Sequence, residues 1–484
     1  MSAEARSNGH APDPIAGQPS SNGHRPGVAE ILELRAAETM ALNQRHLNPQ
    51  IGSVVQTLGF DRDWAHGRGA YLVDRHGDEY LDLLSGYGVF ALGRNHPYVK
   101  RSLHEVIDAD TPSMPQLGVS TLAGVLAERL LAAAPSSVDA VVLTSSGTES
   151  VEGAIKLARA ATRRPRLLYL ERGFHGLTLG SLSVNGNAEF RERFGPLLPG
   201  CDPVPFGDLD ALERELSAGD VAAFIVEPVQ GKGVYIPDAG YLPAAQRLCR
   251  AHGTLLIADE VQTGLGRTGR FLALEHWGLE PDLITLSKAL SGGFVPTGAV
   301  LASRKVFTAT FDTMERSVVH GSTFGGGDLA AAAALATLDV LEHEQLVSRA
   351  AALGERLLEL TRPLVERFEI VRDVRGLGLI WAIELGPPRG RLSRQVWEAI
   401  ERRQPGLFAQ LVTVPLFREH RILTQVAGHH MNVIKALPPL IVTDEQLQGF
   451  AGALEDVLMA AEQRMLRSYT RLGVGLGRRK LSAH

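Results

Sequence analysis

Cysteine is scarce in this sequence, because 484 residues include only two, Cys201 and Cys249. The two lie far apart, without a CxxC spacing or a neighbouring histidine cluster. Neither a disulfide framework nor a structural zinc site is therefore indicated, and no metal is expected. Two free thiols fit a reducing environment, so the sequence predicts a cytoplasmic protein.

Long apolar runs are also missing. The most apolar stretch, LAAAAALATL from Leu329, has about half the length that spans a bilayer, and the N-terminus lacks the charged start and apolar block of a signal peptide. We therefore expect no membrane span. The formal net charge of -5 gives no general attraction to nucleic acid, and the locally basic end RRKLSAH is most simply a solvated tail.

The composition predicts a globular protein of about two or three domains, with 44% hydrophobic and 21% charged residues. Residues 1–28 are rich in Ser, Gly, Asn, Pro and His and are expected to form a disordered tail. Residues 29–90 combine a helical pattern with a hairpin in AYLVDRHGDEYLDLLSG and are assigned to a small domain. A large domain is expected over 91–345, the C-terminal part of the small domain over 346–468, and a basic tail over 469–484.

The middle of the chain alternates helical segments with five short apolar segments: AVVLTSS, LLYLE, AAFIVEP, TLLIADE and DLITLS. Strands separated by helices form a parallel sheet that is covered on both faces. A helical stretch to about Phe368, the alternating segment EIVRDVRGLGLIWAIEL and an amphipathic helix near 443–468 follow. The expected fold class is α/β, with a mostly parallel central sheet in the large domain and a smaller α+β domain built from both chain ends.

Ligands of such sheets bind outside the carboxyl ends of the strands, so the residues that follow each strand are candidate site residues. Gly147 and Thr148 follow AVVLTSS and open a helix, where a glycine, a hydroxyl and free amides suit a phosphate. An ordinary helix N-cap is the alternative. Asp259 ends TLLIAD, where its carboxylate can pair with a cation, cap a helix or form a structural ion pair.

Lys288 follows the apolar strand DLITLS directly. A lysine there is costly unless its amine is solvated, paired or used covalently, and desolvation also makes the amine a better nucleophile. Extension of the side chain to the surface is the alternative for Lys288 alone. Because Lys288, Asp259 and the turn at Gly147 follow strands of one sheet, we expect them to meet. A phosphate site, an acid for a ring nitrogen and an amine for a Schiff base are the three requirements of pyridoxal phosphate.

Six motifs carry a resemblance to a known family: TSSGTESVEGAIKLAR, FHGLTLGSLS, VEPVQGKGV, LLIADEVQTGLGRTG, DLITLSKALSGG and HGSTFGGG. In order and spacing they resemble class III pyridoxal-phosphate aminotransferases, a group that includes ornithine, acetylornithine and 4-aminobutyrate aminotransferases. The resemblance covers roughly residues 45–460. It implies fold type I, pyridoxal 5'-phosphate as the cofactor, and transfer of an amino group between a small-molecule amino donor and a keto or aldehyde acceptor.

The resemblance also implies roles for individual residues. Lys288 would carry the cofactor as an internal aldimine and then move a proton as base and acid, and Asp259 would keep the pyridine nitrogen protonated. Thr323 would reach the phosphate of a neighbouring subunit, which implies a homodimer with shared sites. The other implied cofactor contacts come from Ser146, Gly147, Thr148 (phosphate), Phe174 (ring stacking), Glu227, Val261 (ring packing) and Gln262 (ring hydroxyl).

The sequence departs from the family pattern at residues expected to meet the substrate. Leu177 stands where many relatives have an arginine that binds a carboxylate, Lys232 replaces a glutamate, and Lys435 replaces a second arginine. Lys435 and Lys232 either bind a carboxylate or are solvated surface groups, and Tyr87 is a further candidate substrate residue. Because an apolar side chain cannot pair with an anion, we expect an uncharged or bulky substrate end beside Leu177.

The stretches LLSGYGVFALGRNHP and HRILTQVAGHHMNVIKALPPL resemble a bacterial branch labelled aspartate aminotransferase family, some members of which are linked to hopanoid side-chain amination. An aminomutase or racemase with the same cofactor, and a non-catalytic cofactor-binding protein, are the alternative functions. The run GLGRTGR is only a weak dinucleotide-binding pattern, because it does not open a helix directly after a strand. His175 and His320 are interpreted as packed or hydrogen-bonded structural residues.

Overall fold

The computed structural model describes residues 25–114, 118–428 and 430–481, and the side chains at 392, 396 and 464–481 are left out of the description. The predicted disordered tail lies mostly outside these residues. The chain divides into two compact units between Asp63 and Trp64. In the described residues, no helix is long and apolar enough to cross a bilayer, and no group of three or more His, Cys, Asp and Glu side chains is arranged to hold a metal ion.

The first unit is helical, as the pattern from Val28 predicts. Its elements are α1 (Val28–Leu34), η1 (Ala36–Glu38), α2 (Thr39–His46) and α3 (Pro49–Leu58). Asn48 caps α3, because its side chain accepts hydrogen bonds from the amides of Gln50 at 3.0 Å and Ile51 at 3.4 Å. Gly59, with φ of 74°, ends the helix in the left-handed conformation that glycine adopts without strain.

A seven-stranded sheet is the centre of the second unit, in the order β4-β10-β9-β8-β7-β5-β6. All strands run parallel except β10, which is antiparallel to both neighbours. The strands are β4 (Ala140–Thr144), β5 (Arg166–Leu170), β6 (Cys201–Val204), β7 (Val221–Val226), β8 (Leu255–Asp259), β9 (Leu283–Leu286) and β10 (Gly298–Ala302). This arrangement confirms the α/β fold class and the five predicted strands.

Two strands of this sheet were not predicted. The edge strand β6 contains Pro203, which cannot donate a ladder hydrogen bond and masks the strand pattern. Strand β10, GAVLA, consists mainly of small residues after a glycine-rich turn and carries no alternation. Both gain their structure from pairing with neighbouring strands, which a local pattern does not report.

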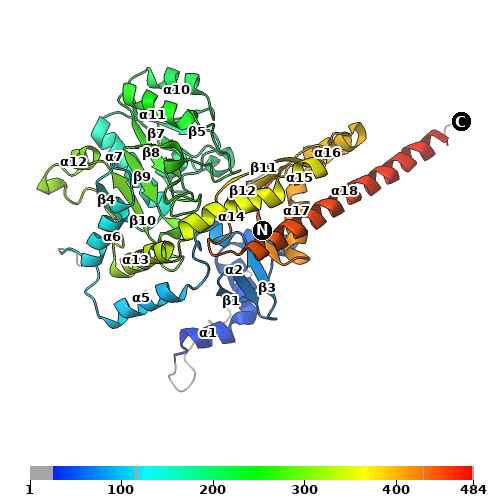
Figure 1. Ribbon diagram of the computed structural model, residues 1–484, viewed down its shortest axis with the longest axis horizontal. Coiled ribbons are helices and arrows are strands. Elements are labelled where there is room, and N and C mark those ends of the chain that lie inside the picture. The colour runs from blue at the N-terminus through cyan, green and yellow to red at the C-terminus, as the bar shows by residue number, and fades with distance from the viewer. Residues whose placement is uncertain (1–24, 115–117, 429, 482–484) are drawn as a thin grey trace, which may run out of the picture. The chain divides into compact units, whose positions relative to one another are not determined.

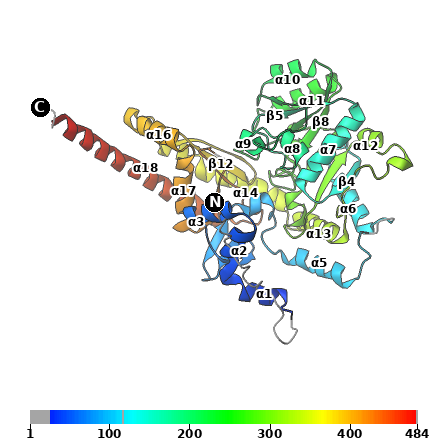
Figure 2. The ribbon, with the colours of Figure 1, turned by 180° about the vertical axis from the view of Figure 1, so that it is seen from behind.

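Helices cover both faces of the large sheet (Figures 1 and 2). One face packs against α7, and the core on this side includes Val151, Ile155, Leu157, Tyr169 and Ile257. The other face forms a core with α10, α11 and α13. The helices of this region are α5 (Pro97–Asp108), α6 (Thr121–Ala132), α7 (Gly147–Thr162), α8 (Leu179–Ser183), α9 (Ala188–Arg191), α10 (Leu209–Leu216), α11 (Tyr241–Ala251), α12 (Arg304–Thr310) and α13 (Asp328–His343), with the 3-10 turns η2 (Ala273–Trp277), η3 (Lys288–Ser291) and η4 (Met314–Arg316).

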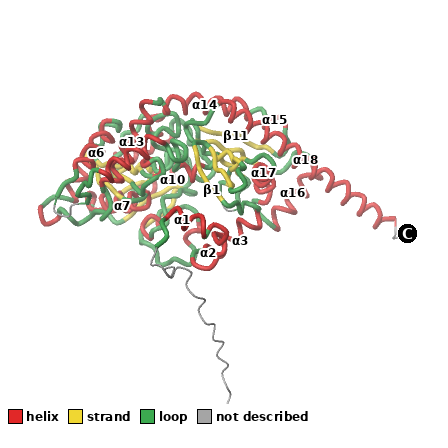
Figure 3. Tube along the Cα trace, turned by 90° about the horizontal axis from the view of Figure 1, so that it is seen from below, coloured by secondary structure: helices red, strands yellow, loops and turns green. Residues whose placement is uncertain are grey.

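Two smaller four-stranded sheets stand apart from the large one (Figure 3). The first has the order β1-β2-β3-β13 and joins β1 (Trp64–Arg68), β2 (Tyr71–Asp74) and β3 (Glu79–Asp82) to β13 (Ile422–Leu423). The second is antiparallel and has the order β11-β12-β15-β14, from β11 (Val371–Leu377), β12 (Ile380–Leu385), β14 (Gln425–Val426) and β15 (Val433–Ala436). Because β13 pairs with β3, the smaller α+β part is built from segments far apart in the sequence, as expected.

The remaining elements are α4 (Ser85–Gly88), α14 (Leu346–Thr361), α15 (Leu364–Arg367), α16 (Arg391–Arg403), α17 (Leu407–Arg418) and α18 (Asp444–Leu481). The helical stretch to Phe368 and the antiparallel pair β11–β12 agree with the prediction. The closing helix begins where expected but continues to Leu481, through the segment predicted to be a separate basic tail. The domain boundaries near residues 90 and 345 stay predictions.

Candidate functional site

The turn between β4 and α7 forms one wall of the site. Ser146 is the N-cap of α7, and its hydroxyl accepts a hydrogen bond from the amide of Glu149 at 3.3 Å. A Cβ atom at Gly147 would lie 2.8 Å from Cγ1 of Val261, so glycine is needed for the helix to start this close to the turn after β8. The first amides of a helix have no partner within it and carry the positive end of its dipole. This wall therefore suits an anion such as a phosphate.

The segment after β5 packs against the start of α7. The Thr148 hydroxyl lies 2.7 Å from the hydroxyl of Thr178 and 2.6 Å from that of Ser181. A Cβ atom at Gly176 would lie 2.5 Å from Oγ1 of Thr148, so the backbone approaches closely here. Leu177 lies between these contacts with 57% of its surface exposed. An exposed apolar side chain therefore stands beside the turn at Thr148.

Asp259 ends β8 as a buried carboxylate, 4% exposed, with both oxygens engaged. Its Oδ2 lies 2.7 Å from Nδ1 of His175. Its Oδ1 accepts hydrogen bonds from the Thr285 hydroxyl at 3.0 Å and the Val261 amide at 3.1 Å. Such contacts fix the orientation of a carboxylate. Asp259 can therefore hold a proton on a basic ring nitrogen.

His175 is a residue whose contribution to the site the sequence underestimated. Burial alone would lower the pKa of this imidazole, but the hydrogen bond and the charge of Asp259 outweigh burial and raise the pKa. Its Nε2 atom is buried without a partner among the described residues. The expectation of a hydrogen-bonded histidine is confirmed, and the partner is the acid of the site. His320, the other histidine considered, lies with Nδ1 3.1 Å from Nζ of Lys156.

Lys288 begins η3, after β9 and the single residue Ser287. Its φ of 40° lies in the left-handed region, which is strained for a residue with a side chain and often marks a functional position. Burial lowers the pKa of the Lys288 amine, against the opposing charges of Asp259 and Glu227. None of the hydrogen bonds between described residues involves this amine. Lys288 is thus a partly desolvated amine that is free to react.

Glu227 follows β7 and is a second buried carboxylate, 6% exposed. It accepts hydrogen bonds from the amides of Phe174 at 2.9 Å and Gly231 at 2.8 Å, and burial raises its pKa. Lys435 lies in β15, is 3% exposed, and donates to the Gly231 carbonyl oxygen at 2.8 Å. Burial, followed by repulsion from Lys288, lowers the pKa of Lys435 to about 7. The interpretation of Lys435 as a solvated surface lysine is wrong, because packing of β15 places its side chain inside the molecule.

Lys232 is not a solvated surface lysine either, since its side chain is only 13% exposed. Its Nζ lies 3.1 Å from Oε1 of Glu189, 3.8 Å from the centre of the Phe190 ring and 5.7 Å from that of Phe174. The Phe174 ring contacts the Phe190 ring edge to face, with 5.4 Å between their centres. The sequence did not single out Glu189 or Phe190, because nothing in the pattern of α9 shows which way they face.

The turn Ser85–Gly88 approaches the site from the smaller part of the unit. The Gln262 side-chain amide donates to the Tyr87 carbonyl oxygen at 3.0 Å, while its Oε1 atom is buried without a partner among the described residues. Tyr87 has a φ of 63° and is 53% exposed. Gln262 and Tyr87, two separately predicted residues, are therefore in contact.

Thr323 is exposed in the single chain. The preceding residue, Ser322, lies with its hydroxyl 2.7 Å from that of Ser145, which belongs to the turn before α7. The segment of Thr323 is thus attached next to the wall that suits an anion. The expectation that Thr323 serves a neighbouring subunit stays a prediction.

These residues fit the pyridoxal phosphate that the sequence predicts. The free amides at Gly147 suit a phosphate, the Asp259 carboxylate suits a protonated ring nitrogen, and the Lys288 amine has no partner among the described residues. The buried Oε1 of Gln262, which likewise lacks a partner among them, offers a hydrogen-bond acceptor in the same place. An acceptor of this kind is rarely left unpaired, which indicates a ligand or water beside it.

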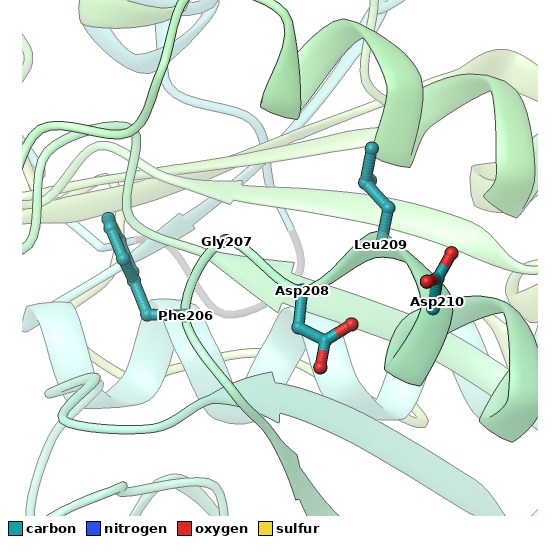
Figure 4. A pocket seen from close by; sticks show the side chains of 5 residues that line it. All are labelled: Phe206, Gly207, Asp208, Leu209 and Asp210. Atoms are coloured by element: carbon teal, nitrogen blue, oxygen red, sulfur yellow. The ribbon is translucent and has the colours of Figure 1, made fainter.

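A separate hollow lies at the start of α10 (Figure 4). Its lining residues are Phe206, Gly207, Asp208, Leu209 and Asp210. The Asp208 carboxylate is already used as the helix N-cap, because it accepts a hydrogen bond from the amide of Ala211 at 2.8 Å. None of the predicted site residues lines this hollow, so it is not part of the site around Lys288.

Comparison with known proteins gives a consistent result. Residues 55–458 match the profile of the family described as aminotransferase class-III. The chain is 34% identical to aminotransferase PigE from Serratia sp. (strain ATCC 39006) over 452 residues, which are 87% of this chain and 53% of PigE, so it spans about half the length of that relative. It is 38% identical to a putrescine aminotransferase from Pectobacterium atrosepticum over 407 residues, 82% of each protein. A PLP-bound amine transaminase from an uncultivated Pseudomonas species aligns with a TM-score of 0.72 and 33% identity, over 82% of this chain and 94% of that one.

Proposed function

Since the chain belongs to the class-III aminotransferases, which work with pyridoxal phosphate on a type I fold, we propose that it exchanges an amino group between an amino acid and an uncharged carbonyl compound. The amino acid and its oxo acid form one substrate pair. A primary amine with an uncharged or bulky far end, and the matching aldehyde or ketone, form the other. The exposed apolar side chain of Leu177 beside the turn at Thr148 carries this proposal.

The proposed cofactor contacts follow the geometry of the site. The turn Ser146, Gly147 and Thr148 binds the phosphate through helix amides. Val261 and Phe174 lie against the ring, and Gln262 faces its hydroxyl. Glu227 acts indirectly, because its carboxylate holds the backbone at Phe174 and Gly231.

Asp259 and Lys288 carry the proposed chemistry, and His175 orients Asp259. Once bound, the cofactor supplies an electron sink that stabilises a carbanion. Asp259 holds the proton on the ring nitrogen, and His175 keeps the Asp259 carboxylate oriented by its hydrogen bond. The Lys288 amine would take the proton from the amine-bearing carbon of the substrate as a general base and return it, as a general acid, to the cofactor carbon that ends up bearing the amino group. Its lowered pKa keeps a larger share of the amine in the basic form near neutral pH.

The two substrate pairs are proposed to use different sides of the site. Leu177 cannot pair with a carboxylate or offset its desolvation, so the uncharged end of the amine or aldehyde lies there. Lys435 is a buried amine in the same site and is the proposed partner of the amino acid carboxylate. The putrescine aminotransferase relative is named for a donor that lacks a carboxylate, which supports a carboxylate-free amine here, although the far end of putrescine is a second ammonium.

A panel of donors and acceptors on the purified holoenzyme tests this function, with each half reaction followed by the absorbance of the cofactor. We expect primary amines with an uncharged far end to be turned over faster than 4-aminobutyrate and ornithine. Leu177→Arg should shift the preference toward carboxylate-bearing donors. Leu179→Arg, at another exposed leucine nearby in sequence, is the matched control. Equal turnover of ornithine and the best amine, or an unchanged preference in Leu177→Arg, would contradict the proposal. Turnover without an amino acceptor would indicate an aminomutase or racemase instead.

The protein is further proposed to be a homodimer in which Thr323 contacts the phosphate bound by the neighbouring subunit. The exposure of Thr323 next to the turn before α7 supports this. Cofactor and dimer then stabilise one another by linkage, so pyridoxal phosphate should raise the melting temperature and suppress dissociation on dilution. A fully active monomer would contradict it. We also propose a cytoplasmic location, which the two free cysteines support.

A further inference from the structure

The ammonium of Lys232 lies beside three side chains that suit a cation, Phe174, Phe190 and Glu189, which we term the cation chamber. This ammonium lies 3.8 Å from the centre of the Phe190 ring, 5.7 Å from that of Phe174, and 3.1 Å from a carboxylate oxygen of Glu189. Aromatic faces and a carboxylate are the groups that bind ammonium ions in proteins. On another side, a Cβ atom at Gly428 would lie 3.9 Å from Nζ of Lys232, so the loop after β14 also reaches this chamber.

The chamber belongs to the site around Lys288. The amide of Phe174 is bonded to Glu227, and Glu227 also holds Gly231, the residue before Lys232. Gly231 in turn accepts the hydrogen bond from Lys435. The cation chamber and the proposed carboxylate partner Lys435 are therefore connected through the segment 227–232, and the charge of Glu227 also acts on the Lys288 amine.

The ammonium of Lys232 is chemically the same group as the far end of a diamine. A diamine that reacted at Lys288 through one amine would need a place for its second ammonium, and the chamber of Phe174, Phe190 and Glu189 is such a place. In this structure the protein's own lysine fills it. The Glu189 carboxylate is paired with Lys232, so a second ammonium would meet a like charge without a free counter-ion.

We propose that the ammonium of Lys232 occupies the cation chamber and so keeps a second substrate ammonium out of it. The enzyme would then reject amines with a second ammonium and select amines with an uncharged far end. This inference rests on the proposed function, because it concerns the choice of amine in that reaction. It extends that function by naming the residue that excludes diamines, and it does not depend on the role of Leu177. Lys232 acts on specificity and takes no part in bond breaking.

The test compares matched pairs of amines on the holoenzyme: putrescine with butylamine, cadaverine with pentylamine, and hexamethylenediamine with hexylamine. In the wild type, kcat/KM for each diamine should fall below that for its monoamine by about tenfold or more. Lys232→Ala empties the chamber and should raise the diamine-to-monoamine ratio by about tenfold for at least one chain length. Adding Glu189→Gln to Lys232→Ala should remove most of this gain, because the counter-ion is lost.

Controls separate specificity from damage. Lys232→Arg keeps a cation in the chamber and should keep the wild-type ratio, and Lys100→Ala, at an exposed lysine of α5, should change nothing. A melting curve and the monoamine rate show whether each variant is folded. A diamine-to-monoamine ratio of kcat/KM that is the same in wild type, Lys232→Ala and the double variant would contradict the proposed role of Lys232. Absence of activity with every amine in the wild-type enzyme would instead contradict the proposed function.

Discussion

Lys288 and Lys435 are two lysines of one site, the first half-buried and the second buried, and burial lowers the pKa of both. Lys288 lies two residues beyond the end of β9, on a strained backbone, and its amine has no hydrogen-bond partner among the described residues. Lys435 lies within β15 and its amine is held by the Gly231 carbonyl oxygen at 2.8 Å. The comparison teaches that burial alone does not make a lysine a catalyst. The position after a strand leaves the amine of the proposed catalyst Lys288 without a partner among the described residues, whereas the interior of β15 fixes Lys435, the proposed binding group.

The largest effect is expected when each lysine is removed in turn. Lys288→Ala should lower turnover by on the order of a thousandfold or more, because it removes the amine proposed to move the proton. Lys435→Ala should keep kcat within about tenfold and raise KM for the amino acid, because it removes a binding group only. Steady-state kinetics of both variants, with melting curves to establish folding, measure this. Similar losses in kcat for the two variants would remove the distinction between them.

Asp259→Asn tests the carboxylate proposed to hold the proton on the ring nitrogen. A neutral amide cannot hold the ring nitrogen protonated, so the rate should fall by on the order of a thousandfold while the phosphate contacts keep the cofactor bound. Cofactor retention after gel filtration and single-turnover rates are the measurements. Thr285→Val, which removes only one hydrogen bond to Asp259, is the milder matched variant. Near-normal turnover of Asp259→Asn would exclude Asp259 from the mechanism.

His175→Ala tests the residue behind Asp259. Hydrogen bonds to charged groups contribute about 1.5–3 kcal/mol, so the loss in rate should be roughly tenfold to a hundredfold. A purely structural role would lower stability and leave the pH dependence of kcat in the folded enzyme unchanged. Loss of the Asp259 partner should shift that pH profile, and the double variant with Asp259→Asn should be little slower than Asp259→Asn alone. Additive losses in the double variant would show that His175 acts independently of Asp259.

The smallest effect concerns pH. A carboxylate binds the ammonium form of Lys435, which is present below its pKa of about 7 and is lost as the pH rises through that value. The KM of the amino acid or oxo acid should therefore rise by up to about tenfold per pH unit above this pKa. The KM of the amine with an uncharged far end should not show this rise. Lys435→Met should flatten the first profile. Parallel pH profiles for both substrate pairs would contradict the role of Lys435.

The sequence predicted the part of the site that depends on strand ends. Asp259 ends an apolar strand, and Lys288 and Gly147 follow two others, of one mostly parallel sheet, and the topology brings such positions to the same edge. Lys435 and Lys232 could not be placed, because their burial depends on how β15 and the segment after Glu227 pack in three dimensions. His175 was seen only as a histidine after Phe174, since its bond to Asp259 joins residues 84 positions apart. The chamber residues Glu189 and Phe190 have no local pattern, because α9 has only four residues.

Borohydride reduction of the holoenzyme, followed by peptide mass mapping, tests the central distinction between Lys288 and Lys435 most directly. Reduction makes the bond between cofactor and lysine permanent, so the labelled peptide identifies the lysine that was attached. We predict a label on Lys288 in the segment DLITLSKALSGG and none on Lys435. A label on Lys435, or on any lysine other than Lys288, would contradict the account of this site.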